Sequence, residues 1–133
     1  MEPHLVRKIL INDLGCVNYG TVLSIQKDLQ EQRIKGDIPD TLILVEHEPV
    51  YTLGKNANRD HLLQSRDKSI EVFNIGRGGD VTFHGPGQLV GYPILDLRNY
   101  KKSVSWYMRR LEELIIKVLK EFDIKGSRIK GLT

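Results

Sequence analysis

The sequence predicts an α/β domain. Short apolar runs of the kind that form strands alternate with two longer segments whose apolar residues recur at helical spacing. The 133 residues contain no internal repeat, no low-complexity tract and no linker rich in serine and proline. A chain of this length favours a single domain over residues 1–133, which can bury a substantial part of the surface that the unfolded chain exposes.

The first third of the chain predicts a strand, a helix and a second strand. The first strand is expected over Leu5–Ile11 and is closed by turn-forming residues that include Gly15. Apolar residues recur every three or four positions over Val17–Lys35, which predicts a helix that ends at Gly36. The apolar run Thr41–Glu46 predicts the next strand.

Three more strands are expected in the middle of the chain. Val50–Leu53 follows a proline and is expected to be an edge strand, because proline cannot donate to a sheet ladder. Residues 55–69 are expected to form a surface loop. Ile70–Ile75 alternates like a strand, and Gln88–Leu97 predicts another strand whose Pro93 indicates an edge or a bulge.

The clearest helix is predicted over Ser103–Phe122, with Ser103 as the N-cap. Its apolar stripe is expected to face the core, and Arg109, Glu113 and Lys117 are expected to support one another on the other face. The stripe consists of Val104, Tyr107, Met108, Leu111, Leu114, Ile115, Val118, Leu119 and Phe122.

Composition excludes several classes of protein. No run approaches the roughly 20 apolar residues that a membrane span requires. The N-terminus has no cationic lead before an apolar core, so we expect no secretory signal, no membrane association and a cytoplasmic protein. Cys16 is the single cysteine and cannot form an internal disulfide.

Charge is unevenly distributed. Residues 1–97 hold 10 basic and 13 acidic side chains, a balance of −3, whereas residues 98–133 hold 10 and 4, a balance of +6. The basic segment is interpreted as a solvated helix face or as a docking surface for an acidic partner. It lacks the interleaved aromatic residues of single-strand binders, so no nucleic acid is expected.

Residues 76–92 carry six of the 12 glycines of the chain. Such density indicates a long hairpin, or a backbone that something else approaches closely. Arg77, Thr82, His84 and Gln88 add a cation, a hydroxyl, an imidazole and an amide to this segment. It is not a P-loop, because no Gly-Lys-Ser or Gly-Lys-Thr occurs, and a dinucleotide fingerprint would be followed by a helix.

The four histidines are His4, His47, His61 and His84, and their spacing is not that of a zinc site, so no metal is expected. His47 is expected to be a hydrogen-bonded residue at the end of a strand. His84 is expected to be functional, and the alternative is a purely structural loop anchor.

Two ordered blocks resemble one known family. The run Arg77-Gly78-Gly79-Asp80-Val81-Thr82-Phe83-His84-Gly85-Pro86-Gly87-Gln88 is similar to the signature of the lipoyl(octanoyl) transferases, also called lipoate-protein ligase B. Leu44-Val45-Glu46-His47-Glu48-Pro49-Val50-Tyr51-Thr52-Leu53-Gly54 is similar to a second block of that family. The resemblance implies the fold of biotin and lipoate ligases, a mixed sheet with flanking helices, incomplete at the C-terminus.

The resemblance also implies an activity. Members of the family move an octanoyl group from acyl carrier protein to an enzyme cysteine, and then to a lysine of a lipoyl domain, without ATP or another cofactor. The implied partners are octanoyl-acyl carrier protein, the lipoyl domains of 2-oxoacid dehydrogenase complexes and the glycine cleavage H protein. The chemistry requires a thiolate, a nearby lysine and an apolar acyl tunnel.

The resemblance assigns substrate-binding residues but no catalytic residue to this sequence. The family's lysine and its nucleophilic cysteine are expected beyond Thr133, and Cys16 does not match the nucleophile. We therefore expect an N-terminal part of an octanoyltransferase. The residues expected to line the acyl pocket are Arg77, Gly78, Gly79, Asp80, Val81, Thr82, Phe83 and His84.

Two alternatives remain open from the sequence. One is an ATP-dependent lipoate or biotin ligase on the same fold, although the lipoate ligases resemble R-x-x-G-G-G-x-V-x-H-D, which differs from the glycine-rich run of this chain. The other is a non-catalytic module that binds an acyl group or a carrier protein.

Overall fold

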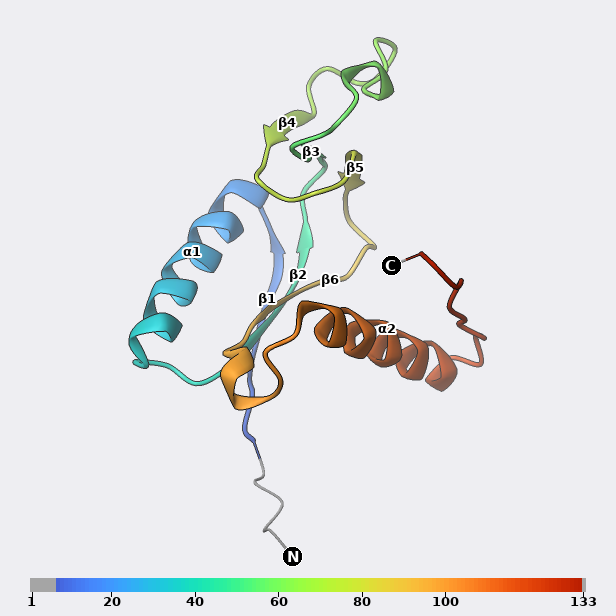
Figure 1. Ribbon diagram of the computed structural model, residues 1–133. Helices are drawn as coiled ribbons and strands as arrows, with labels where there is room; N and C mark the ends of the chain where they lie inside the picture. Colours follow the sequence, from blue (N-terminus) through green and yellow to red (C-terminus); the bar gives the residue numbers. More distant parts are fainter. Residues whose placement is uncertain (1–6, 133) are drawn as a thin grey trace, which may run out of the picture. The chain divides into compact units, whose positions relative to one another are not determined.

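The computed structural model describes residues 7–132, which contain six strands and two α-helices (Figure 1). The strands are β1 (Leu10–Val17), β2 (Thr41–His47), β3 (Val50–Leu53), β4 (Glu71–Asn74), β5 (Val81–His84) and β6 (Val90–Ile94). The helices are α1 (Tyr19–Lys35) and α2 (Val104–Glu121), with short 3-10 helices η1 (Arg59–His61) and η2 (Leu97–Asn99). The chain divides into two compact units, Met1–Leu95 and Asp96–Thr133. A single domain over 1–133 stays a prediction.

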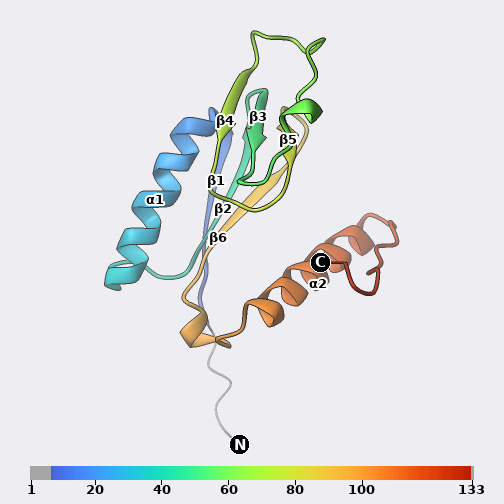
Figure 2. The same ribbon diagram turned by 45° about the horizontal axis from the view of Figure 1, so that its top comes forward.

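The α/β class with mixed strand pairing is confirmed, but the strands form two sheets. The first has the order β1-β2-β6, and β2 is parallel to β1 and antiparallel to β6. The second has the order β4-β3-β5, and β3 is parallel to β4 and antiparallel to β5. Figure 2 shows the second sheet beyond the end of β2, where the chain passes directly into β3.

The core of the first unit lies between α1 and β2. Residues of β2 alternate between buried and half-buried, so that Ile43 and Val45 point to the same face and contact Val22 of α1. These three side chains are at most 1% exposed. The other face of β2 carries Leu42 and Leu44, which stay half-buried.

Helix α1 is confirmed, with its expected end. Asn18 precedes it, and its side-chain oxygen accepts hydrogen bonds from the backbone N–H groups of Gly20 and Thr21. Gly36 ends the helix in the left-handed conformation with φ +83°, which glycine adopts without a steric penalty.

The prediction for the first strand was wrong. Its expected range, Leu5–Ile11, lies partly outside the described residues, and β1 continues to Val17. The pairing of β1 with β2 shifts register between Asp13 and Cys16, so the turn-forming residues lie within the strand. Gly15 there has φ +68°. The turn-forming residues mark a bulge in a continuing strand rather than its end.

The prediction of an edge position for Val50–Leu53 was also wrong. Strand β3 is central in its sheet, because residues Val81–His84 of the glycine-rich segment form β5 and pair with it. Pro93 does lie in an edge strand, since β6 pairs with β2 alone in the described sheet. The loop at residues 55–69 contains η1 and is mostly exposed.

In the second unit, α2 is confirmed with Ser103 as its N-cap, which accepts from the Trp106 N–H at 3.2 Å. The expectation that its apolar stripe is core was wrong for the described residues, where no α2 side chain is buried. Val104 and Phe122 are 72% and 71% exposed. Within residues 7–132, every helix is too short or too polar to span a membrane.

Ion pairs cover the polar face of α2. Lys117 binds Glu113 at 3.1 Å as expected, but Arg109 pairs with Glu112, and Arg110 takes the other bond to Glu113. These pairs fit the interpretation of a solvated face. Docking of an acidic partner on this basic segment stays a prediction.

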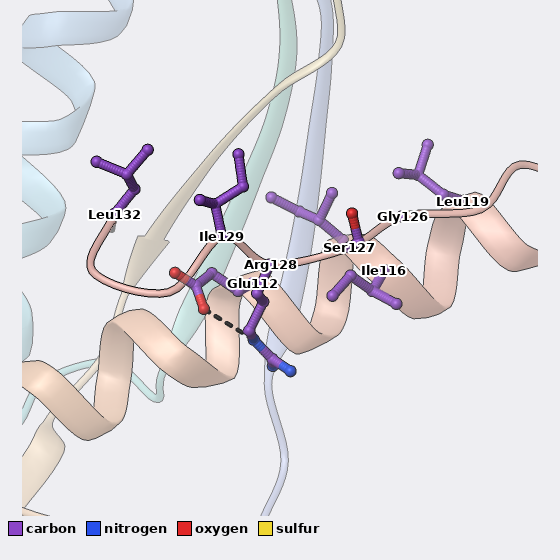
Figure 3. Close-up of a pocket in the computed structure, with 9 residues that line it drawn as sticks. Glu112, Ile116, Leu119, Gly126, Ser127, Arg128, Ile129 and Leu132 are labelled. Atoms are coloured by element: carbon purple, nitrogen blue, oxygen red, sulfur yellow. Dashed lines mark hydrogen bonds and ion pairs between the residues drawn. The ribbon is translucent and has the colours of Figure 1, made fainter.

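The segment after α2 turns back along the helix, and an open groove of about 380 Å³ lies between the two (Figure 3). Arg128 fixes this return, since its Nε donates to Glu112 at 2.8 Å and its Nη2 donates to the Arg109 carbonyl at 3.2 Å. The lining residues are mainly apolar and include Ile115, Ile116, Leu119, Ile129 and Leu132.

Candidate functional site

The expected substrate-binding run, residues 77–84, lies between β4 and the end of β5 in the first unit. It consists of a short turn followed by a strand rather than one long loop. The turn packs against the end of β3, and the last residue of β5 lies near the ends of β2 and α1. All eight expected residues are therefore placed along one continuous segment.

Arg77 holds this segment to the sheet. Its Nη2 donates to the hydroxyl oxygens of Thr52 at 2.9 Å and Thr82 at 3.0 Å, and to the Asp80 carbonyl at 3.2 Å. Its Nη1 donates to the Gly78 carbonyl at 2.7 Å. Guanidinium is suited to this task because it offers five donors in a fixed plane. Arg77 is thus bound to the protein's own acceptors, and it joins β3 to β5.

Each glycine near Arg77 has a different environment. A Cβ atom on Gly54 would lie 2.2 Å from the Gly79 carbonyl oxygen, which no side chain tolerates. Gly79 has φ +95°, a conformation that other residues rarely adopt. A Cβ atom on Gly78, by contrast, would have no neighbour within 4 Å, so this position faces open space.

Asp80 fastens the 55–69 loop to the glycine-rich segment. Its carboxylate accepts a short hydrogen bond from His61 Nδ1, and others from the backbone N–H groups of Val81 at 2.8 Å and Asn58 at 3.0 Å. These bonds lower the pKa of Asp80 below its ordinary value, and the bond from His61 has the largest effect. No sequence pattern indicated the partnership with His61, which lies 19 residues away.

Strand β5 alternates in its exposure and contacts. Thr82 pairs with Thr52, and both hydroxyls accept from Arg77. Phe83 is 48% exposed and its ring lies 5.3 Å from that of Tyr51. Val81 is half-buried and pairs with Leu53. Phe83 thus leaves about half of its apolar surface exposed on this sheet.

Four polar rings meet where α1, β2, β5 and β6 come together, and the apolar ring of Phe73 in β4 also lies 5.2 Å from that of Tyr19. The ring of His84 is parallel to that of Tyr19, with centroids 6.4 Å apart and an interplanar angle of 5°. It lies 5.9 Å from the ring of His47, which in turn lies 5.1 Å from Tyr19 and 5.8 Å from Tyr92. Two imidazoles and two phenols therefore form one cluster.

His47 is fully buried and hydrogen-bonded at both ring nitrogens, which confirms the expectation of a bonded residue at the end of a strand. Nδ1 lies 3.1 Å from the Val17 carbonyl oxygen, and Nε2 lies 2.7 Å from the Tyr92 hydroxyl. A carbonyl only accepts, so Nδ1 carries the proton and Nε2 accepts from Tyr92. Burial raises the pKa of Tyr92 to about 12, so this phenol keeps its proton.

No three His, Cys, Asp or Glu side chains in residues 7–132 converge as a metal site would require. Cys16 is exposed on β1 and takes no part in the ring cluster. Sequence reasoning did not place Tyr19 or Tyr92 in the site. The two-residue period of a strand was the available signal, since it puts His47 on the same face as Ile43 and Val45.

Comparison with known proteins identifies the family. The catalytic-domain model for lipoyl protein ligases A and B matches residues 18–132. The chain belongs to the lipoyl protein ligase A/B catalytic domain family. This confirms the family relationship that the two sequence blocks predicted.

Three relatives of this ligase-family chain are named octanoyltransferase. That of Gloeobacter violaceus is 48% identical over 127 residues, which are 95% of this chain and 57% of the relative. That of Pelobacter propionicus is 44% identical over 94% of this chain and 58% of the relative. That of Solibacter usitatus is 46% identical over 96% and 60%. The chain therefore spans a little more than half the length of these relatives.

We predict that Arg77→Lys destabilises the chain by about 1–3 kcal/mol, because one ammonium cannot replace the planar set of donors to Thr52, Thr82 and Asp80. Urea unfolding measures the loss. Arg59→Lys is the matched control, since Arg59 is exposed and makes a single 3.3 Å bond to Asn74. Equal losses in the two variants would contradict the role given to Arg77.

We also predict that the free energy of unfolding falls as the pH drops from about 7.5 to about 5.5. Burial is the main cause that lowers the pKa of His47 from its ordinary 6.5, with repulsion from His84 adding to it and the bond to Val17 opposing it. Below pH 6.5 the unfolded chain therefore binds more protons than the folded chain, and stability is lost. His47→Gln should flatten this dependence. Urea unfolding across this range that shows the same slope in native and His47→Gln chains would refute the assignment.

Proposed function

We propose that this chain forms the acyl-binding part of an octanoyltransferase of lipoate biosynthesis. The octanoyl group would pass from the thioester of acyl carrier protein to an enzyme cysteine and then to the lysine amine of a lipoyl domain. In each step a new bond to the carbonyl carbon forms as the existing C–S bond breaks. No ATP is required, because a thioester is already activated for attack by a nucleophile.

The observation that carries this proposal is membership in the lipoyl protein ligase A/B family together with relatives that are named octanoyltransferase. The glycine-rich run supports transfer rather than ATP-dependent ligation, since it follows the transferase signature up to Gln88. The nucleophilic cysteine and the lysine belong to the family pattern beyond Thr133. Cys16, exposed on β1, is not assigned a role in the transfer.

The acyl pocket is proposed along residues Arg77–His84. Arg77 and Asp80 would hold the wall in shape, because their polar groups are bound within the protein. Gly78 faces open space and Phe83 exposes an aromatic surface, so these two would meet the apolar chain. Burial of methylene groups of the acyl chain against this wall would supply the binding energy.

The proposed partners are octanoyl-acyl carrier protein as donor, and the lipoyl domains of 2-oxoacid dehydrogenase complexes and the glycine cleavage H protein as acceptors. The cytoplasm is the compartment in which this protein is proposed to meet them. No cofactor is assigned.

A transfer assay tests the proposal. The chain is continued at its C-terminus with the corresponding segment of the Gloeobacter violaceus octanoyltransferase, and that relative serves as the positive control. Mass spectrometry should show octanoylation of a lipoyl domain from octanoyl-acyl carrier protein without ATP, and Cys16→Ser should not change the rate. A requirement for ATP and free octanoate would overturn the proposal in favour of a ligase.

We predict that Gly78→Val in this continued chain impairs octanoyl transfer more than butanoyl transfer while leaving stability nearly unchanged. The added side chain enters open space in the protein and competes only with a bound acyl chain. Each methylene group of the acyl chain that is no longer buried costs about 0.8 kcal/mol of binding, which lowers the rate of transfer several-fold. The measurement compares the rates of octanoyl and butanoyl transfer in the native and variant chains, with each chain at the same folded fraction.

Gly79→Val is the contrasting variant. Its φ of +95° and a Cβ position 2.9 Å from Arg77 Nη1 make the substitution costly to folding, by about 1–3 kcal/mol. Its loss of activity should therefore follow its loss of stability. If Gly78→Val slowed both donors equally, the pocket wall would have to lie elsewhere.

A further inference from the structure

The segment after His84 is a type II turn. Residues Gly85, Pro86, Gly87 and Gln88 form it, with the Gln88 N–H donating to the Gly85 carbonyl at 3.2 Å. Proline suits the second position of such a turn, and the third requires positive φ, which Gly87 adopts at +90°. The chain therefore reverses within four residues.

Glu46 adds a second restraint on this turn. Its carboxylate accepts the Gly87 N–H at 2.9 Å, although the two residues are 41 positions apart. Glu46 belongs to β2, directly before the buried His47. The turn is thus held both by its own hydrogen bond and by the central strand of the first sheet.

This geometry returns the Gln88 side chain to His84. Gln88 Oε1 lies 2.6 Å from His84 Nδ1, and an amide oxygen only accepts, so Nδ1 carries the proton of the neutral ring. Nε2 is then unprotonated, with its lone pair available. Within residues 7–132 no hydrogen bond to His84 Nε2 is formed, while the ring rests parallel to that of Tyr19.

The neighbouring imidazole has the same tautomer but no free acceptor. His47 Nε2 is occupied by the Tyr92 hydroxyl, and its side chain is fully buried, whereas His84 is half-buried. Of the two rings, only that of His84 presents an unoccupied nitrogen lone pair. The difference follows from Gln88 on one ring and Tyr92 on the other.

We propose that Gln88 is a positioning residue that holds His84 in the Nδ1-protonated tautomer, so that Nε2 accepts a hydrogen bond from an N–H group of the substrate. The inference rests on the proposed function for the identity of that substrate, a donor or acceptor of the octanoyl group. Thioester arms carry amide N–H groups and lysine acceptors carry an amine, and both can donate to an imidazole nitrogen. Glu46 and Gly87 serve the same end by fixing the turn that delivers Gln88.

The titratable groups that face the His84 ring are Tyr19 of α1 and His47 of β2. Tyr19 stays protonated near neutral pH, since burial raises its pKa despite the opposing effect of Arg77, and burial is the main cause that lowers the pKa of His47 and so disfavours its charged form. Neither Gln88 nor the paired Val50 of β3 titrates.

The first test is the tautomer in the 133-residue chain, measured by long-range ¹H–¹⁵N NMR. Native His84 should show a protonated Nδ1 and an unprotonated Nε2, and Gln88→Leu should move most of the proton to Nε2. Gln88→Glu should keep the native tautomer and raise the pH at which His84 titrates, because a carboxylate favours imidazolium. Gln30→Leu, an exposed glutamine of α1, is the control and should change nothing.

The second test uses transfer by the continued chain. Gln88→Leu should slow transfer about tenfold at unchanged stability, the value of one hydrogen bond. Gln88→Glu should restore the rate at high pH and move the acidic limb of the pH–rate profile to higher pH, since imidazolium cannot accept at Nε2. A role in turn stability alone would leave that limb in place.

Each failure has a distinct meaning. A native His84 protonated at Nε2, or an unchanged tautomer in Gln88→Leu, would overturn the positioning role whether or not the enzyme transfers octanoate. An unshifted pH profile in Gln88→Glu would do the same. The expected tautomers in a chain with no transfer activity would instead contradict the proposed function.

Discussion

The structure of the first unit depends on the burial of one polar side chain. His47 is 0% exposed at the end of the central strand β2, so each of its ring nitrogens needs a partner within the protein. The carbonyl of Val17 supplies one and the hydroxyl of Tyr92 the other. One imidazole thereby ties the β1–α1 junction to β2 and to β6.

The remaining site geometry follows from where β2 ends, at His47. The chain passes within two residues into β3, whose Thr52 and the following Gly54 receive Arg77 and Gly79 of the glycine-rich segment. Glu46, on the other side of His47, holds the Gly87 turn. The glycine-rich segment is therefore attached at both of its ends. The parts of this segment that face outward are those that make no such contacts within the protein.

Sequence patterns predicted the elements that local chemistry determines. Asn18 and Ser103 cap helices as such residues do, and Gly36 ends one. The two family blocks also indicated the segment along which the acyl pocket is proposed. These features depend on residues that are close together in sequence, where propensity and spacing are informative.

The errors have a common physical origin in contacts between distant residues. The bulge near Gly15 looks like a strand end until β1 is seen to pair with β2 on both sides of it. A strand inside a glycine-rich segment becomes recognisable only when β3 lies beside it. The α2 stripe has the pattern of a core helix, and yet burial also requires a covering surface, and within the second unit the segment that returns along α2 leaves an open groove over it.

The titration of His47 tests most directly whether this ring is the neutral, doubly bonded imidazole on which the first unit depends. NMR titration of the native chain should show the neutral His47 ring with its single proton on Nδ1, and a pKa below that of an imidazole in water, because burial lowers it from the ordinary 6.5. A His47 ring that titrates near 6.5, like an imidazole in water, would contradict this assignment.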